Sequence, residues 1–270
     1  MTARPASLGM YDHPAIGAAN DALWTAIAAR LITAGVEGVP AELDRARPLP
    51  AIWDDPALLL AQICGYPLVT RWSGRLRYVA TPRYRVPGCE GAHHRSRFVV
   101  RRADPAETLA SARGRRAAIN EPTSNTGMNL LRAAVAAHAG GQPFFSTVIE
   151  TGSHAASARL VASGGADIAA IDMVSFAHLE RHEPNVTRNL RTLGWSVSVP
   201  GLPLVTARTT RPKDVTILRR VLQEIAGDPA LMEVRETLLL DGFDVLHPAR
   251  HRSALRLERD AERAGYPLLA

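Results

Sequence analysis

Short apolar runs and helix-like repeats alternate along much of the chain. Runs with the length and composition of buried strands lie at residues 117–120, 146–149 and 166–171. Downstream of the first run, Met128, Leu131 and Val135 are spaced as on one face of a helix. Strands that alternate with helices predict an α/β protein with a largely buried sheet.

The remaining elements follow from the same periodicity. We expect helices at residues 16–31, 54–64, 176–182, 215–225, 230–240 and 254–265. We expect extended segments at residues 6–10, 49–53, 76–80, 97–101, 193–199 and 204–207. Asp54 and Pro56 open the second of these helices, because a carboxylate cap and a proline in the first turn favour a helix start.

The order of the elements predicts two lobes, each a mixed sheet flanked by helices. Residues 1–81 plus 205–270 form lobe 1, and residues 82–204 form lobe 2. The central segment carries the polar turns, and the chain then returns for its last helices. Two crossings between lobes make a hinge, so we expect the ligand to bind between them.

A polar turn follows the strand at 117–120 and precedes the helix at 128–135. It contains Ser124, Asn125 and Thr126. Backbone N–H groups in the first turn of a helix lack internal partners, and the helix dipole adds positive charge there. These groups and side chains together predict a socket for an oxyanion. The alternative is an ordinary helix cap, since Ser, Thr and Asn are favoured at that position.

Two more strands end in polar side chains. Ser153 and His154 follow the strand at 146–149, and Asp172 follows the strand at 166–171. Ligands of open α/β sheets bind at the carboxyl ends of strands, so these three side chains are candidate ligand contacts. A single histidine is also compatible with a purely structural role.

The charge of the chain does not indicate nucleic-acid binding. The net charge is +6 and the isoelectric point is about 10, and Lys213 is the single lysine among the basic residues. The arginines are spread along the chain and are not interleaved with aromatic residues, as a nucleic-acid platform requires. We interpret them as solvated surface. His178 and His182 are four residues apart but do not form a His-Glu-x-x-His motif, so we expect no metal site and no cofactor.

Compartment and redox state stay open at this point. No run of 18 apolar residues is present, so no membrane-spanning helix is expected. Residues 1–10 lack the apolar stretch of a signal peptide. We therefore expect a periplasmic protein if a leader was removed, and a cytoplasmic protein otherwise. Cys64 and Cys89 form either one disulfide or two thiols; we expect them to approach each other in lobe 1 and to pair if the protein is exported.

With these residues in place, the chain resembles the phosphate, phosphite and phosphonate substrate-binding proteins of ABC transporters. The similar segments are residues 52–67, 81–82, 87–91, 120–127 and 152–157. The resemblance implies a two-lobe type II periplasmic-binding-protein fold that closes on its ligand by hinge motion. It also implies that the protein captures a small oxyanion and delivers it to an ABC permease if exported.

The resemblance also implies roles for individual residues. Ser124, Asn125 and Thr126 correspond to the turn that holds the phosphonate oxygens, and His154 corresponds to a downstream histidine of the family. Asp172 matches a carboxylate that follows the next strand. Candidates for an aromatic side chain that lines the cleft are Tyr11 and Trp53. A cationic group on the ligand would suit Asp12, Asp54 or Asp172.

Two other functions are compatible with the same fold. One is a cytosolic enzyme of small-molecule biosynthesis, such as those of the thiamine-pyrimidine and menaquinone pathways. Ser153 and His154 are sequence neighbours and do not form a recognisable nucleophile–base pair, so we expect no enzyme. The other is a ligand-sensing domain of a regulator, for which no helix-turn-helix segment is left over.

Overall fold

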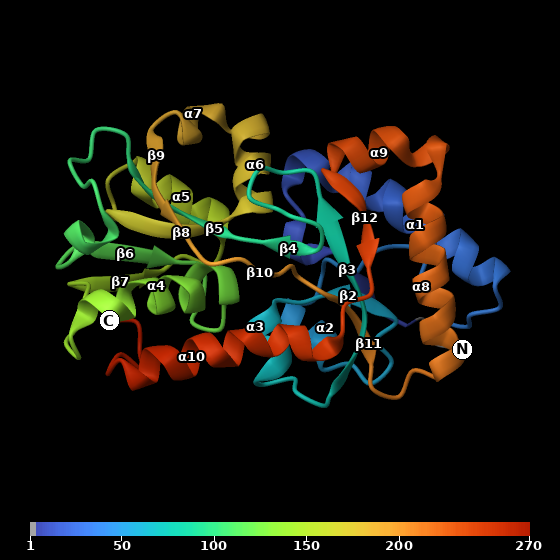
Figure 1. Cartoon of the computed structure of the whole chain (residues 1–270). Helices are drawn as coiled ribbons and strands as arrows, with labels where there is room; N and C mark the ends of the chain where they lie inside the picture. Colours follow the sequence, from blue (N-terminus) through green and yellow to red (C-terminus); the bar gives the residue numbers. More distant parts are fainter. Residues whose placement is uncertain (1–3) are drawn as a thin grey trace. The chain divides into compact units, whose positions relative to one another are not determined.

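The computed structural model describes residues 4–270 and divides into two compact units (Figure 1). Unit 1 contains the chain up to Arg85 together with Cys89–His93 and Pro200–Arg250. Unit 2 contains Val86–Gly88, His94–Val199 and His251–Ala270. Each unit is built on a five-stranded sheet, and a separate two-stranded sheet pairs β4 (His93–His94) with β10 (Val199–Pro200).

The sheet of unit 1 is mainly antiparallel. Its strands, in spatial order, are β1 (Ala6–Ser7), β2 (Leu60–Gln62), β11 (Leu204–Ala207), β3 (Leu76–Tyr84) and β12 (Leu240–Asp244). Within residues 4–270, β1 pairs with β2 in parallel, and the other strand pairs of this sheet are antiparallel. The helical segments of this unit are η1 (Gly9–Tyr11), η2 (Pro14–Ile16), α1 (Gly17–Thr33), α2 (Leu49–Trp53), α3 (Gly65–Val69), α8 (Pro212–Gly227), η5 (Pro229–Leu231) and α9 (Met232–Thr237).

Alternation along β11 divides the apolar side chains of unit 1 between two clusters. Leu204 packs with Trp24 of α1 and Leu222 of α8 in the larger cluster. The next residue, Val205, belongs to a second cluster with Trp53 and Trp72. Successive side chains of a strand point to opposite faces, so the sheet of unit 1 has an apolar cluster on each face.

The sheet of unit 2 combines parallel and antiparallel strands. In spatial order they are β7 (Thr147–Glu150), β6 (Arg116–Ile119), β8 (Ile168–Asp172), β5 (Ser96–Arg101) and β9 (Leu190–Trp195). The first three are parallel, so their carboxyl ends lie at the same edge of the sheet. The helical segments of this unit are η3 (Leu109–Ala112), η4 (Asn125–Asn129), α4 (Leu130–Ala139), α5 (His154–Ala162), α6 (Met173–His182), α7 (Pro184–Thr187) and α10 (Ser253–Arg263), while η6 (Pro248–Arg252) spans the boundary with unit 1.

The expected α/β class is confirmed, but some elements were predicted wrongly. Residues 49–53 form helix α2 rather than an extended segment, because Pro50 occupies the first turn after an extended Pro48. The expected helix at 54–64 is replaced by a turn and strand β2. Leu240 begins strand β12 rather than ending a helix, and at the first strand only Ala6–Ser7 is extended.

The C-terminal helix lies in unit 2, whereas the sequence pattern placed residues 205–270 together in lobe 1. Helix α10 packs against α4, and the Ala270 carbonyl accepts hydrogen bonds from the backbone N–H groups of Phe144 and Phe145. The chain therefore passes between units once more at 250/251. Residues 82–85 and 200–204 belong to unit 1 rather than to the second lobe.

The two cysteines lie in unit 1, but no disulfide joins them. Cys64 is buried immediately before helix α3, whereas Cys89 is half-buried beside the turn at Gly88. The expected disulfide is therefore absent from the structure. Among residues 4–270, no helix is both long enough and apolar enough to cross a bilayer.

A buried arginine joins helix α4 to the C-terminal segment. Arg132 donates to the Pro267 carbonyl at 2.8 Å and to Asn129 Oδ1 at 2.6 Å, and its side chain is 4% exposed. We predict that Arg132→Met lowers the free energy of unfolding by about 3 kcal/mol, because the buried Oδ1 of Asn129 loses a charged donor and the link to the Pro267 carbonyl is broken. Urea unfolding measures the change. Arg263→Met, at an exposed position of α10, is the control and is expected to change stability by no more than about 0.5 kcal/mol. Equal changes in the free energy of unfolding for the two substitutions would show that the contacts of Arg132 add no more stability than an exposed ion pair.

Candidate functional site

The polar turn after β6 starts a helix, as the sequence pattern predicts. Ser124 is extended, and its Oγ accepts a hydrogen bond from the Gly127 N–H at 2.9 Å. The first turn is a π-helix over Asn125–Asn129, in which the Asn129 N–H bonds to the Ser124 carbonyl, and α4 continues it. The capping role of Ser124 and the expected socket are compatible, because the hydroxyl accepts from Gly127 and keeps its own hydrogen for another acceptor. Ser124, Asn125 and Thr126 are only 1–3% exposed.

Gly127 is required by the close approach of Asn120, the residue after β6. A Cβ atom at position 127 would lie 1.9 Å from Asn120 Oδ1 and 3.2 Å from Cε1 of His154. Asn120 Oδ1 is itself buried, and within residues 4–270 it has no hydrogen-bond partner. The strand end, the first helix turn and His154 therefore meet around a position that only glycine fits.

The structure brings the two predicted polar turns together. Ser153 caps helix α5 by accepting from the Ala156 N–H, and His154 is the first residue of that helix. His154 Nε2 lies 2.9 Å from Thr126 Oγ1. A hydrogen bond thus joins the turn after β6 to the helix start after β7.

Asp172 lies at the carboxyl end of β8 and is completely buried. Its Oδ1 accepts from the N–H groups of Val174 and Ser175, so it caps helix α6. Its Oδ2 lies 3.1 Å from Nδ1 of His94, which is also buried. Both carboxylate oxygens of Asp172 are therefore engaged by groups of the chain, Oδ1 by the start of α6 and Oδ2 by His94.

The ionisable groups of this cluster influence one another. Burial opposes ionisation of Asp172, but the charges of His94 and His154 and hydrogen bonds from His94 and the Ser175 N–H bring its pKa down to about 2. Burial lowers the pKa of His154, and His94 adds to that effect. The charge of Asp172 and the backbone of Ala170 partly counteract it. Near pH 7 the carboxylate of Asp172 is therefore ionised and the imidazole of His154 is neutral.

Two supporting contacts were not predicted from the sequence. Asn129 Nδ2 donates to Asn125 Oδ1 at 2.9 Å and to the Ala254 carbonyl at 3.1 Å. Ser96 Oγ donates to the Thr126 carbonyl at 2.8 Å. Asn129 and Ser96 orient the turn. No local motif marks the contact of Asn129 with Ala254 or that of Ser96 with Thr126, because each joins two different elements.

The candidates from the first part of the chain lie in unit 1. Tyr11 packs edge-to-face on Tyr84 with ring centroids 5.4 Å apart. Trp53 is 5% exposed, and its indole N–H donates to the Gln62 carbonyl. Asp54 does not start a helix as expected. It accepts from the indole N–H of Trp72 and forms ion pairs with Arg71 and Arg75.

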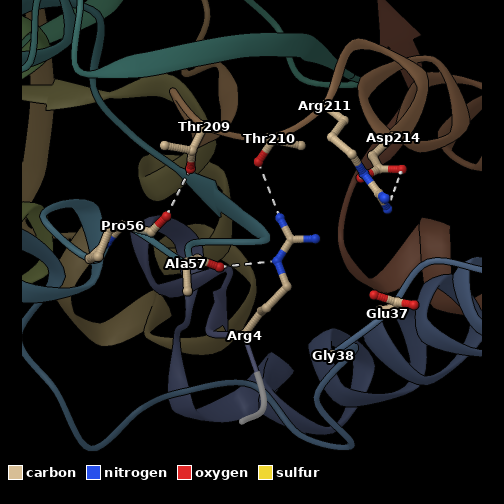
Figure 2. Close-up of a pocket in the computed structure, with 9 residues that line it drawn as sticks. All are labelled: Arg4, Glu37, Gly38, Pro56, Ala57, Thr209, Thr210, Arg211 and Asp214. Atoms are coloured by element: carbon tan, nitrogen blue, oxygen red, sulfur yellow. Dashed lines mark hydrogen bonds and ion pairs between the residues drawn. The ribbon is translucent and has the colours of Figure 1, made fainter. Parts of the chain in front are cut away.

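A cavity of about 430 Å³ lies in unit 1, and none of the predicted site residues lines it (Figure 2). Arg4 reaches across it to the Ala57 carbonyl and the Thr210 hydroxyl, and Arg211 pairs with Asp214 (Figure 2). Glu37 adds a second carboxylate to the lining. Arg4 already bonds to neutral acceptors of the chain and Arg211 to Asp214, so the turn in unit 2 is the better candidate. Among residues 4–270, no group of three or more His, Cys, Asp and Glu side chains is arranged to hold a metal ion.

The sequence matches a protein family described as "ABC transporter, phosphonate, periplasmic substrate-binding protein" over residues 65–250. The chain belongs to this family. It is therefore a solute-binding protein of the ABC-transporter class. No curated protein is similar enough to match the chain.

Solved structures show the same fold. PhnD1 from Prochlorococcus marinus in complex with methylphosphonate is 13% identical, with a TM-score of 0.77, over 97% of this chain and 98% of that one. A binding protein component of an ABC phosphonate transporter (PA3383) from Pseudomonas aeruginosa is 16% identical, with a TM-score of 0.76, over 97% and 87% of the two chains. XAC2383 from Xanthomonas citri bound to ATP is 17% identical, with a TM-score of 0.71, over 97% of both chains. The expected two-lobe type II periplasmic-binding-protein fold is confirmed.

Substitution of Gly127 tests the close approach to Asn120. We predict that Gly127→Ala lowers the free energy of unfolding by about 1–3 kcal/mol, because the new methyl group overlaps Asn120 Oδ1. Gly227→Ala is the control, since a Cβ there meets nothing within 4 Å at the end of a helix. It is expected to raise stability by about 0.4–1 kcal/mol. Chemical unfolding of both variants measures these changes. A Gly127→Ala protein with unchanged stability would contradict the close approach of Asn120 Oδ1 to position 127.

The lowered pKa of Asp172 predicts a loss of stability in acid. The ionised carboxylate stabilises the fold above its unfolded pKa of about 3.8, and this contribution is lost as the pH falls towards about 2. The full contribution is about 2 kcal/mol. Urea unfolding from pH 5 to pH 2 should show a steeper decline for the native chain than for Asp172→Asn, which keeps a capping oxygen but cannot ionise. Parallel curves would show that Asp172 is not ionised in the fold.

Proposed function

We propose that the chain binds a small oxyanion, such as a phosphonate, phosphite or phosphate ester, at the turn formed by Ser124, Asn125 and Thr126. One observation carries the proposal: a buried helix start and the imidazole of His154 meet at Thr126, with 2.9 Å between Nε2 and Oγ1. Hydrogen bonds made there are strengthened because water is excluded. The methylphosphonate in the complex of the Prochlorococcus marinus protein supports this ligand class.

The residues have distinct roles in this proposal. The hydroxyl of Ser124 and the first-turn N–H groups take ionised oxygens of the ligand. Asn125 is oriented by the amide of Asn129. Thr126 and His154 form the second contact, and Ser153 keeps His154 at the start of α5. The charge of Asp172 acts on the imidazole of His154, and Asp172 itself does not contact the ligand.

The proposed role needs no catalytic step and no cofactor. The protein captures its solute and transfers it to an ABC permease, in the periplasm if it is exported. Tyr11, Trp53 and Asp54 of unit 1 are candidates for further ligand contacts. An enzyme of the same fold is the alternative, and turnover of a bound phosphonate would identify it.

The role of Ser124 is tested by calorimetry with methylphosphonate, phosphite and phosphate. We predict that Ser124→Ala weakens binding of the best ligand by about 10- to 150-fold, because a hydrogen bond to a charged oxygen contributes about 1.5–3 kcal/mol. Ser111→Ala is the matched control, because it removes a capping hydroxyl of η3 in the same unit. Affinity should be unchanged in the control. Ser124→Ala with native affinity would exclude the turn as the binding site, and absence of any binding would exclude the ligand class.

A further inference from the structure

The first turn of the proposed oxyanion site is supported by side chains that follow it in the chain. Resting on the proposed function, we propose that Asn129 and Arg132 are positioning residues of that site and make its geometry depend on the docked helix α10. Neither side chain contacts the ligand. Both act through Asn125 and through the backbone of the first turn.

That turn is a π-helix, which is a rare geometry in proteins. The N–H of Asn129 bonds to the carbonyl of Ser124, five residues earlier, and the N–H of Leu130 repeats the pattern. An α-helix leaves four N–H groups at its start without helical partners, and the wider π-helical turn leaves one more. The turn thereby provides an additional donor for an oxyanion, as long as other contacts keep it from tightening into an α-helical turn.

The side chain of Asn129 spans the π-helical turn and supports it. Its Nδ2 donates to Oδ1 of Asn125, the first residue of the turn, at 2.9 Å. The same nitrogen donates to the Ala254 carbonyl on α10 at 3.1 Å. Asn129 has no exposed surface and Asn125 is 3% exposed, so water does not replace these bonds when they are lost.

Arg132 determines which way the amide of Asn129 is turned. Its Nη2 donates to Asn129 Oδ1 at 2.6 Å. A guanidinium has donors only, so the amide atom that faces it must be the oxygen, and the amide nitrogen must face Asn125 and Ala254. The Asn125 atom that accepts from this nitrogen is therefore also the oxygen. The direction of each bond follows from the chemistry of the groups and does not depend on a protonation state.

Helix α10 takes part in the same set of contacts. It packs against α4 and η4 (Figure 1). The Ala254 carbonyl in its first turn accepts from Asn129, and the Pro267 carbonyl beyond its end accepts from Arg132 at 2.8 Å. The C-terminal segment is therefore bonded to both positioning residues, and its undocking would remove a partner from each.

Ligand affinity separates a positioning role from a general loss of stability. Asn129→Leu keeps the size of the side chain and removes both N–H bonds. Val135→Ala is the matched control on α4, because it opens a cavity at a fully buried position whose side chain forms no hydrogen bond. Calorimetry uses methylphosphonate, phosphite or phosphate, whichever the native chain binds best. Asn129→Leu should bind it about 10-fold or more weakly, because the N–H groups of the turn lose their alignment, whereas Val135→Ala should keep native affinity despite its lower stability.

A pair of substitutions at Arg132 tests the orientation of the amide. Arg132→Met allows the Asn129 amide to reverse, so that its oxygen faces Asn125, and should weaken binding by about 10-fold. Arg132→Lys keeps a group that only donates and should retain affinity to within about 3-fold. Equal losses in the two variants would overturn the role of Arg132.

Hydrogen exchange of the native chain tests the dependence on α10 without any substitution. Coupling between two parts of a protein is reciprocal, so an oxyanion bound at the turn should stabilise the docked α10. Saturation with the same ligand should slow exchange of α10 amides more than exchange of β9 amides, since β9 is an edge strand of the same sheet. Equal slowing would indicate only a general stabilisation of unit 2 and would overturn the dependence on α10.

The outcomes separate this inference from the proposed function. Native affinity in Asn129→Leu, or equal weakening in Asn129→Leu and Val135→Ala, would overturn the positioning role. If Asn129→Leu does not fold, the Arg132 pair and hydrogen exchange of the native chain still test the inference. Failure of the native chain to bind methylphosphonate, phosphite and phosphate would instead overturn the proposed function, and the inference with it.

Discussion

The carboxylate of Asp172 is an ionised group with no exposed surface, and partners from several elements of unit 2 compensate its charge. A buried charge is very costly unless it is paired and hydrogen-bonded. Two N–H groups of α6 and the imidazole of His94 supply the partners. The same charge acts on His154, which bonds to Thr126. The charge of Asp172, at the end of β8, thereby interacts with His94 on β4 and with the starts of helices α5 and α6.

The features of the site that depend on neighbouring residues were predictable from the sequence. The strand before Ser124 and the helix after it follow from local periodicity, and polar residues at a helix start have a local physical cause. The meeting of Thr126 with His154 was also expected, because parallel strands end at one edge of a sheet. The pairing of His94 with Asp172 was not, since the partners lie on different elements and a loop histidine gives no signal of its partner.

Unit 1 shows how tertiary packing overrides local patterns. The acidic and proline residues at 54–56 have the appearance of a helix start, yet the residues that follow are needed as strand β2 between β1 and β11. Leu59, Leu60 and Ile63 are fully buried there. Continuous burial of a short apolar run is equally compatible with a helix or with an internal strand, so periodicity alone did not separate them. The C-terminal helix was misplaced for a similar reason, because its docking depends on Asn129 and Arg132 of unit 2.

Burial fixes the hydrogen bonds of the turn before any ligand binds. An exposed threonine would turn its hydroxyl freely, because water would replace whichever hydrogen bond was lost. Thr126 is 2% exposed, its carbonyl is bonded to Ser96, and its hydroxyl has His154 as a partner. Loss of one of these buried partners without replacement would cost about 1–3 kcal/mol, so the orientation of Thr126 depends on residues of two other elements, which the local sequence around Thr126 does not reveal.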